Sequence, residues 1–269
     1  MHLGISSYTY TWSIGVPGSL PDKQMSASDL VDRAASFGLK LVQIADNLPL
    51  ENFTDAELEN LRQYAFNKGI SIEMGGRCLT TEHTLKCLKA AEKLHSPILR
   101  MVIDGAGFEP DIPLIIQIIR ELLPEFESRK IRLAIENHDR LKALEFEQII
   151  KSINSDWVGI CLDSANSMGA GEGFETVAEI LIPYTINLHL KDFTIQRVSH
   201  KMGFIIEGNP AGSGMLNIED LISKLNRLGR CQSAILELWT PPEADLASTI
   251  FKEATWADRS VEFLKQYFK

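Results

Sequence analysis

The chain alternates between short apolar runs and longer stretches in which apolar residues recur with helical spacing. Each apolar run is rich in β-branched residues and predicts a buried strand, and each following stretch predicts an amphipathic helix. Because parallel strands need helical crossovers, eight such units predict an α/β fold, a closed (β/α)₈ TIM barrel, over a single domain 1–269. The predicted strands are residues 3–6, 41–44, 71–74, 98–103, 131–136, 158–162, 186–190 and 234–238.

The ends of several predicted helices carry capping and terminating residues, which supports the alternation. Pro113 suits the first turn of the helix after the fourth strand, whereas Pro124 is expected to kink or break that helix. A doubly wound open sheet is the competing architecture, but no glycine-rich phosphate loop follows the first strand. Helices with a polar cap and a terminal glycine are expected between Ser28 and Gly38, Thr54 and Gly69, and Asn217 and Gly229.

Composition and charge narrow the class of partner. The 269 residues are 45% hydrophobic, enough for a substantial core. The formal net charge is −9, from 27 basic and 36 acidic residues without a dense basic block, so a nucleic-acid partner is disfavoured. No apolar segment is long enough to span a bilayer and no secretory signal begins the chain, so no membrane association is expected. The four cysteines lack zinc-finger spacing and disulfide-scaffold density, which indicates reduced thiols in a cytoplasmic protein.

Two loops depart from a minimal barrel. Residues 192–215 form a long polar and glycine-rich segment after the seventh strand, and a segment of that length is expected to act as a partial lid. Its Arg197 and Glu207 are candidate substrate contacts, with solvated loop charges as the alternative. The first loop holds three aromatic residues that either wall a small-ligand site or pack against a neighbouring loop: Tyr8, Tyr10 and Trp12.

Four predicted strands of the second half end in a residue that can bind a metal. In a closed parallel barrel the carboxyl ends of the strands meet at one face, so inward-pointing groups there converge. Two glutamates, one aspartate and one histidine have the composition of a divalent-cation site, with Mn²⁺ as the first expectation and Mg²⁺, Co²⁺ or Zn²⁺ as alternatives. The expected ligands are Glu136, Asp163, His189 and Glu237, of which the first three are spaced by 27 and 26 positions.

Each of these residues taken alone has a simpler explanation. Glu136 can mark the switch from strand to solvent, and Asp163 can cap the segment that follows it. His189 can be a hydrogen-bonded core residue. Glu237 has the least satisfactory alternative, because a buried carboxylate among apolar neighbours needs a cation or several donors. The prediction of a metal site therefore depends on the four residues occurring together.

These strand ends resemble those of the xylose isomerase-like TIM-barrel superfamily, which includes the sugar phosphate isomerases and epimerases. The resemblance follows strand order over essentially the whole chain, and the turn at residues 210–214 is similar to that family's glycine-rich loop. At Asn166 many relatives have a histidine, so the substrate role of that histidine does not transfer unchanged. The matching segments are Ile135-Glu136-Asn137-His138, Leu162-Asp163-Ser164-Ala165-Asn166, His189-Leu190-Lys191-Asp192 and Leu236-Glu237.

The resemblance implies a metal-dependent isomerase or epimerase of a sugar or sugar phosphate, acting on a ketose through an enediolate. A cation chelated by a carbonyl and an adjacent hydroxyl acidifies the carbon between them. Glu136 and Glu237 are the expected catalytic acid and base as well as ligands, while Asp163 and His189 are ligands only. Candidate substrate-binding residues lie at or just past predicted strand ends: Glu73, Arg100, His138, Asn166 and Lys191.

Other interpretations stay open. A metal that stabilises an enediolate also stabilises the enolate left by decarboxylation, so a lyase is the closest rival. It would decarboxylate a β-oxo sugar acid, as in a branch that includes 3-oxo-isoapionate decarboxylase, or dehydrate an inosose. A non-catalytic sugar-binding barrel is the third interpretation. Lys191 and Asp192 are either partners of the metal ligands or a surface ion pair. Apolar residues of the last helix fit either a homo-oligomer interface or contact with the barrel wall: Phe251, Trp256, Phe263 and Tyr267.

Overall fold

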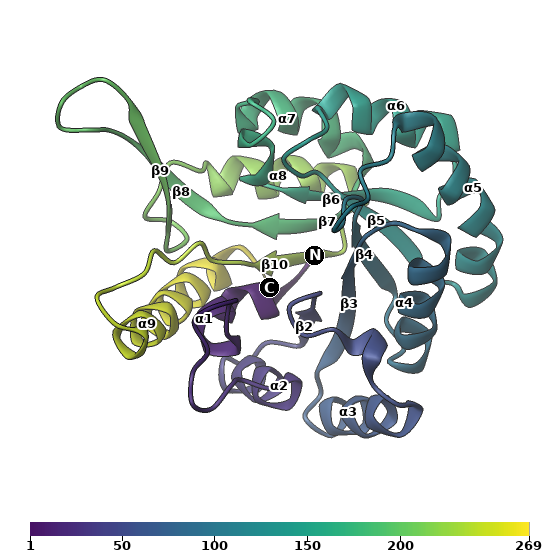
Figure 1. Ribbon diagram of the computed structural model, residues 1–269, viewed down its shortest axis with the longest axis horizontal. Helices are drawn as coiled ribbons and strands as arrows, with labels where there is room; N and C mark the ends of the chain where they lie inside the picture. The colour runs from purple at the N-terminus through teal and green to yellow at the C-terminus, as the bar shows by residue number, and fades with distance from the viewer. Residues whose placement is uncertain (269) are drawn as a thin grey trace.

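In the computed structural model, which describes residues 1–268, eight parallel strands close into a barrel surrounded by helices (Figure 1). Consecutive barrel strands are neighbours, and the last pairs with the first, so the predicted (β/α)₈ fold is confirmed. All eight strands fall where the apolar runs predict them, within a few residues at each end. The barrel strands are β1 (His2–Ser6), β2 (Leu41–Ile44), β3 (Ser71–Arg77), β4 (Ile98–Val102), β5 (Arg132–Glu136), β6 (Val158–Asp163), β7 (Thr185–Leu190) and β10 (Ser233–Leu236).

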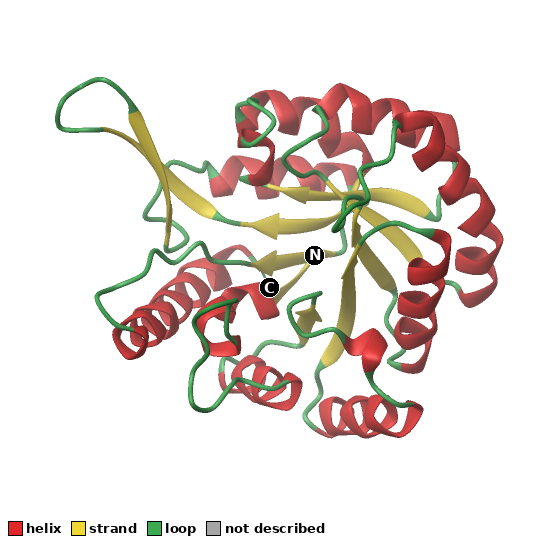
Figure 2. Cartoon of the chain, in the orientation of Figure 1, coloured by secondary structure: helices red, strands yellow, loops and turns green. Residues whose placement is uncertain are grey.

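Helices follow the barrel strands and cover the outside of the barrel (Figure 2). No helix within residues 1–268 combines the length and the apolar content that crossing a bilayer requires. The main helices are α2 (Ala27–Ser36), α3 (Asp55–Asn67), α4 (Thr81–Lys93), α5 (Ile112–Arg129), α6 (Ala143–Ile153), α7 (Phe174–Leu181), α8 (Ile218–Leu228) and α9 (Leu246–Leu264). Short helical turns occur at α1 (Thr11–Ile14), η1 (Ser7–Tyr10), η2 (Leu50–Asn52), η3 (Asn166–Met168), η4 (Ile182–Tyr184) and η5 (Lys265–Tyr267).

Polar caps begin the helices that the sequence marks. At α3 the Thr54 side chain accepts the backbone N–H of Glu57, and the Thr54 backbone N–H donates to the Glu57 carboxylate. At α8 the Asn217 side chain accepts the backbone N–H of Asp220. Helix α2 begins earlier than predicted, because Ser26 rather than Ser28 caps its first turn. The glycines expected to end these helices all have positive φ angles: Gly38 at 70°, Gly69 at 68° and Gly229 at 66°.

Helix α5 continues from Ile112 to Arg129 through Pro124, so the expected break at this proline is wrong. Pro113 lies in the first turn, as predicted. A proline inside a helix loses one backbone hydrogen bond. The apolar face of α5 is buried on both sides of Pro124, at Ile119 and Phe126, and this burial offsets the loss.

Residues 192–215, the segment expected to act as a partial lid, form a β-hairpin and its connection, and the lid role itself stays a prediction. Strands β8 (Asp192–Arg197) and β9 (Phe204–Asn209) pair antiparallel and project away from the barrel (Figures 1 and 2). Only the base of the hairpin reaches the barrel mouth. A Cβ atom at Gly208 would lie 2.2 Å from the carbonyl oxygen of Trp239, so this close approach requires glycine.

A layer of polar side chains fills the barrel interior beneath the strand ends. The amide nitrogen of Gln43 donates to Glu73 Oε2 at 3.1 Å and to Asn187 Oδ1 at 3.2 Å. Asn187 Nδ2 in turn donates to Ser233 Oγ at 2.7 Å. Burial raises the pKa of Glu73 to about 7 despite these donors. This polar layer supports the side chains at the strand ends above it, because the side chains of the layer fix one another's orientation.

The last helix contacts the barrel wall through most of its predicted apolar residues. Trp256, Phe263 and Tyr267 are half-buried against the core. Phe251 is 75% exposed and takes no part in this contact. The wall-contact interpretation therefore accounts for three of these residues.

Candidate metal centre and substrate cavity

The four predicted ligands lie together at the carboxyl ends of their strands. Glu136 ends β5, Asp163 ends β6, His189 lies in β7, and Glu237 directly follows β10. The register of the sheet places Asp163 beside His189. His189 Nδ1 lies 3.3 Å from Glu237 Oε1, 3.5 Å from Glu136 Oε2 and 3.8 Å from Asp163 Oδ2. All four side chains are at most 1% exposed, so three carboxylates and an imidazole share one buried space.

His189 presents a lone pair to these carboxylates. Its Nε2 lies 2.6 Å from Gln43 Oε1, and the amide nitrogen of Gln43 already donates to Glu73 and Asn187. The Gln43 oxygen must therefore accept, so Nε2 carries the ring proton and Nδ1 carries none. Burial keeps the pKa of His189 well below its ordinary range, so the ring is neutral. Among the residues described, Nδ1 has no hydrogen-bond partner.

The donor set fits a divalent cation. Within residues 1–268, Glu136 Oε2 and both carboxylate oxygens of Glu237 are also buried without a hydrogen bond, although Arg100 and Lys191 form ion pairs with Glu136 Oε2 and Glu237 Oε2. Glu237 Oε1 faces only the imidazole lone pair, and a buried carboxylate oxygen in that position is unfavourable unless a cation lies between the two atoms. One oxygen or nitrogen from each of Asp163, His189 and Glu237 lies within 4.8 Å of the others, which is close enough for one ion. Oxygen-rich ligands with one imidazole suit Mn²⁺, Mg²⁺, Co²⁺ or Zn²⁺ alike.

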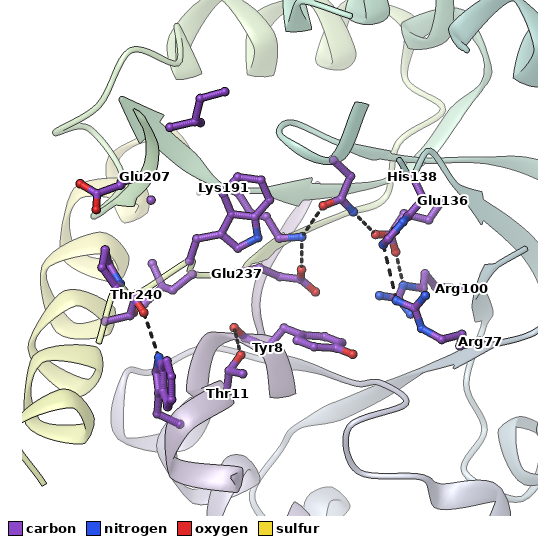
Figure 3. Close-up of a pocket in the computed structure, with 17 residues that line it drawn as sticks. Tyr8, Thr11, Arg77, Arg100, Glu136, His138, Lys191, Glu207, Glu237 and Thr240 are labelled. Atoms are coloured by element: carbon purple, nitrogen blue, oxygen red, sulfur yellow. Dashed lines mark hydrogen bonds and ion pairs between the residues drawn. The ribbon is translucent and has the colours of Figure 1, made fainter. Parts of the chain in front are cut away.

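The Lys191 ammonium group contacts two of these carboxylates, and Figure 3 shows its contact with Glu237. Its Nζ donates to Asp163 Oδ2 at 2.7 Å and forms an ion pair with Glu237 Oε2 at 2.9 Å. Burial by itself lowers the pKa of Lys191, but the negative charges of Asp163 and Glu237 raise this pKa by more than burial lowers it, so the ammonium group stays charged. Lys191 is therefore a buried partner of the candidate ligands, and not half of a surface ion pair.

Asp192 points away from the candidate ligands and holds the glycine-rich turn. Its Oδ2 accepts the backbone N–H groups of Gly212 and Gly214, each at 2.9 Å, and its Oδ1 accepts that of Leu216 at 3.1 Å. A Cβ atom at Gly214 would lie 2.1 Å from Asp192 Oδ1, so the turn needs glycine there. The surface ion pair considered for Asp192 is wrong, because the side chain is buried in these contacts.

A second charged cluster joins the site from β2, β3 and β4. The buried Arg100 forms an ion pair through Nε with Glu136, although without hydrogen-bond geometry, and its Nη1 donates to Asp46 Oδ1 at 3.0 Å. Asp46 Oδ2 accepts from Tyr8 Oη and from Arg77 Nε, each at 3.0 Å. Burial raises the pKa of Glu136 to about 8, although Arg100 acts in the opposite direction. Asp46 thus fixes two arginines and a tyrosine beside the candidate ligands.

A cavity of about 460 Å³ opens beside these groups. Figure 3 shows Arg77 and Arg100 on the same side as Glu136, and Glu207 on the opposite side. Two candidate substrate contacts do not line it among the residues described: Glu73 belongs to the interior polar layer, and the Arg197 guanidinium lies 4.3 Å from the ring of Phe204. The candidate ligands Asp163 and His189 are not among its lining residues either. The lining residues that the sequence singled out are Tyr8, Trp12, Arg100, Glu136, His138, Asn166, Lys191, Glu207 and Glu237.

Asn166 links two of the charged groups. Its Nδ2 donates to Glu136 Oε1 at 2.7 Å, and its Oδ1 lies 3.4 Å from Lys191 Nζ. Its backbone N–H donates to Asp163 Oδ1 at 2.8 Å. The amide that replaces the family's histidine therefore orients Glu136 and Lys191 while lining the cavity.

Sequence reasoning missed three residues that organise the site. Arg77 lies beyond the predicted third strand, 71–74, whereas the strand extends to Arg77 itself. Asp46 lies two residues beyond the predicted second strand, 41–44. Gln43 interrupts the apolar run of β2, which is the same signal that singles out Glu237 in the predicted strand 234–238, so this residue was detectable from the pattern.

Asp46 is expected to make the stability of the fold sensitive to acid. Burial raises its pKa, but Arg100 and Arg77 lower it more, to about 2. A folded-state pKa below the unfolded value contributes stability that is present above pH ~4 and is lost as the pH falls toward 2. The difference in unfolding free energy between wild type and Asp46→Asn should shrink by about 2 kcal/mol between pH ~5 and ~2. Urea unfolding followed by circular dichroism measures it, and a constant difference contradicts the assignment.

Residues 31–267 match the family described as xylose isomerase-like TIM barrel, and the chain belongs to this family. The chain is 32% identical to 3-oxo-isoapionate decarboxylase of Pectobacterium atrosepticum. The alignment covers 98% of this chain and 95% of that relative. The D-psicose 3-epimerase of Clostridium cellulolyticum H10, crystallised with D-tagatose, covers all of both chains with a TM-score of 0.76 and 14% identity. A xylose isomerase-like TIM barrel protein from Mycobacterium smegmatis, crystallised in complex with magnesium, has a TM-score of 0.72 and 16% identity. The superposition covers 100% of this chain and 98% of that protein's chain. These relatives include enzymes of more than one reaction type.

Proposed function

We propose that the protein is a divalent-metal-dependent decarboxylase of a 3-oxo sugar acid. The reaction needs a Lewis acid at the oxo group and a cation that holds the carboxylate. The observation that carries the proposal is that one cavity is lined by two of the candidate metal ligands, Glu136 and Glu237, and by the half-exposed Arg77. The 32% identity to 3-oxo-isoapionate decarboxylase over nearly the whole chain supports it, and we therefore prefer the lyase to the isomerase that the strand ends first suggested.

Arg77 is the cation in the cavity that is most accessible to an anionic substrate. Its side chain is 36% exposed, against 2% for Arg100 and 7% for Lys191, both of which are engaged in buried ion pairs. Asp46 holds its Nε at 3.0 Å, and its Nη2 lies 3.5 Å from His138 Nε2, so the guanidinium is fixed at the rim. A planar guanidinium binds a carboxylate through two parallel N–H donors.

The remaining groups suit the bond changes of a decarboxylation. Glu136, Asp163, His189 and Glu237 would hold the cation, which when bound polarises the oxo group at C3. The bond between C2 and the carboxylate carbon breaks, carbon dioxide leaves, and the electron pair moves through the C2–C3 bond to the oxo oxygen. C2 then takes a proton, for which Glu136 and Glu237 are the nearest proposed donors.

Two tryptophans give the cavity part of an apolar wall. Trp12 and Trp239 both line it, and Trp12 is held by its indole N–H, which donates to the carbonyl of Thr240 at 2.8 Å. The buried Glu253 of α9 accepts the backbone N–H of Trp12 at 2.8 Å. An apolar wall favours loss of a carboxylate as carbon dioxide, because the charge is more dispersed in the transition state.

Isomerisation or epimerisation of a ketose is the second candidate. The observation that favours it is the pair of glutamates, which come from β5 and from the end of β10, with strands β6 and β7 between them in the barrel. Such a pair can remove a proton from one face of a carbon and return one on the other. Both reactions use the same metal site, so their products decide between them.

Product analysis with Mn²⁺-loaded protein in D₂O tests the two reactions against each other. We expect carbon dioxide release from a 3-oxo sugar acid, with deuterium incorporated at the product carbon that was C2 of the acid. A panel of free and phosphorylated ketoses should show neither interconversion nor deuterium exchange at carbon. Exchange into a ketose without carbon dioxide release would establish the isomerase and refute the decarboxylase, and the absence of both reactions would refute both.

Arginine variants provide the matched control for carboxylate recognition. Arg77→Ala should raise KM for the acid by about 10- to 100-fold, because a charge-assisted hydrogen bond contributes about 1.5–3 kcal/mol, while kcat changes little. Arg140→Ala removes a guanidinium that pairs with Asp104 and is not among the cavity-lining residues, so its KM should stay at the wild-type value. Equal KM values for the two variants contradict the role of Arg77.

A further inference from the structure

A second set of metal-binding side chains lies outside the cavity, between α4 and the short turn η2. Glu51 belongs to η2, and His83 and Cys87 belong to α4. One donor atom from each lies within 4.8 Å of the others. His83 and Cys87 are four positions apart on a helix, which places both on one face. We propose that Glu51, His83 and Cys87 bind a zinc ion that joins η2 to α4.

The separation of the sulfur and nitrogen donors suits tetrahedral zinc. Cys87 Sγ lies 3.5 Å from His83 Nε2. Zn–S bonds of about 2.3 Å and Zn–N bonds of about 2.0–2.1 Å, meeting at a tetrahedral angle, place the two atoms about 3.5 Å apart. A weak hydrogen bond from the thiol to the imidazole has a similar length, so the third residue has to separate the two explanations.

Glu51 favours the metal. Its Oε2 atom is buried and, within the described part of the chain, has no hydrogen-bond partner. The neighbouring Lys86 does not supply one, since its Nζ donates to Asn52 Oδ1 at 2.7 Å. A thiol–imidazole hydrogen bond leaves this carboxylate oxygen unsatisfied, which is costly, whereas a cation shared by all three residues satisfies it.

The donor chemistry selects the class of ion. One thiolate, one imidazole and one carboxylate suit Zn²⁺ better than Mg²⁺ or Mn²⁺, which prefer oxygen ligands. Burial raises the pKa of the Cys87 thiol to about 12, which argues against a reactive cysteine, because the thiolate is the nucleophile. A zinc ion displaces the thiol proton when it binds. His83 and Glu51 are only half-buried, which leaves a path for the ion and a fourth position for water.

The proposed zinc ion would stabilise the part of the fold that lies beside the cavity. Turn η2 follows β2 by a few residues, and Asp46, which fixes Arg77 and Arg100, lies in that connection. Helix α4 follows β3, the strand that ends in Arg77. Joining η2 to α4 therefore ties together the two connections that position these arginines. The Lys86–Asn52 hydrogen bond already links the same two elements.

Titration with Co²⁺ as a spectroscopic substitute for zinc tests the proposal on the full chain. We expect the wild type to show a thiolate-to-cobalt charge-transfer band in the near ultraviolet. Cys87→Ser should abolish this band, and Cys161→Ser, which removes a buried cysteine next to the barrel-mouth ligands, should retain it. His189→Ala should also retain it, while binding one Co²⁺ fewer per chain than the wild type. A wild type without the band, or a Cys87→Ser protein that keeps it, overturns the proposal.

The melting temperature provides a second test, which also applies to variants with a weak cobalt charge-transfer band. In the His189→Ala background, Zn²⁺ should raise the melting temperature, since an ion that binds only the folded state stabilises it. Adding Glu51→Gln should remove that rise, and a rise of the same size in both proteins contradicts the role of Glu51. Cys87→Ser should release carbon dioxide at the wild-type rate with Mn²⁺. Failure of the decarboxylase proposal leaves the cobalt band unaffected, so the two proposals fail independently.

Discussion

Replacing His189 by alanine is expected to lower kcat for carbon dioxide release by about 10³-fold, because a metal Lewis acid contributes several kcal/mol to such a reaction. His189 contributes the only nitrogen donor expected at the barrel mouth, and its Nδ1 faces three carboxylates within 3.8 Å. Without it, those carboxylates lose the neutral ligand that completes the set, and the Mn²⁺ content of the protein should fall in parallel. Elemental analysis and initial rates measure the two effects.

His200→Ala is the matched control, since His200 is an exposed residue near the tip of the hairpin. It should retain the wild-type metal content and kcat. If His189→Ala keeps both its cation and its turnover, the metal site at the barrel mouth is refuted. If it loses the cation but keeps its turnover, the ion is not part of the reaction.

Replacing Arg100 by methionine is expected to lower the free energy of unfolding by about 3–5 kcal/mol in the metal-free protein. Arg100 is 2% exposed and forms ion pairs with Glu136 and Asp46. Its loss leaves carboxylates buried without this cation, and the cost of an uncompensated buried charge is larger than the net value of the pair. Urea unfolding in the presence of a chelator measures the change.

Two further arginine variants complete that experiment. Arg62→Met breaks a surface pair with Glu59 and should change the unfolding free energy by at most about 1 kcal/mol. Arg100→Lys retains a charge and should recover part of the loss, but not the fork geometry that contacts both carboxylates. Equal unfolding free energies for Arg100→Met and Arg62→Met would show that the buried cluster does not depend on Arg100.

The strand positions were predictable because the signal is local. Most barrel strands are buried on both faces and read as apolar runs with few interruptions, such as residues 158–162 of β6. The hairpin was missed for the opposite reason. Its strands are exposed, with Ile195 at 41% and Ile205 at 51%, so no buried alternation marks them, and polar residues and glycines dominate the segment. The prediction of a helix break at Pro124 was wrong because burial of the apolar face of α5 outweighed the local preference of proline against a helix interior.

The candidate ligands were predictable because barrel topology converts sequence position into spatial position. A polar residue at the end of an apolar run must lie at the mouth of a parallel barrel, and Glu136 and Asp163 needed no further information. Arg77 was hidden by an error of three residues in the end of β3. Glu73 was misplaced because a position in a strand does not reveal whether the side chain belongs to the mouth or to the layer beneath it.

By itself, the sequence determined the order of strands and helices, and the residue types available at each strand end, because apolar periodicity and capping depend on neighbours along the chain. Only the tertiary structure decided how those residues work together. The proton position on His189 depends on Gln43, 146 positions away, and Asp46 reaches Arg100 across 54 positions. Closing a barrel brings such side chains within hydrogen-bond distance through strand register and side-chain orientation, which no local pattern encodes.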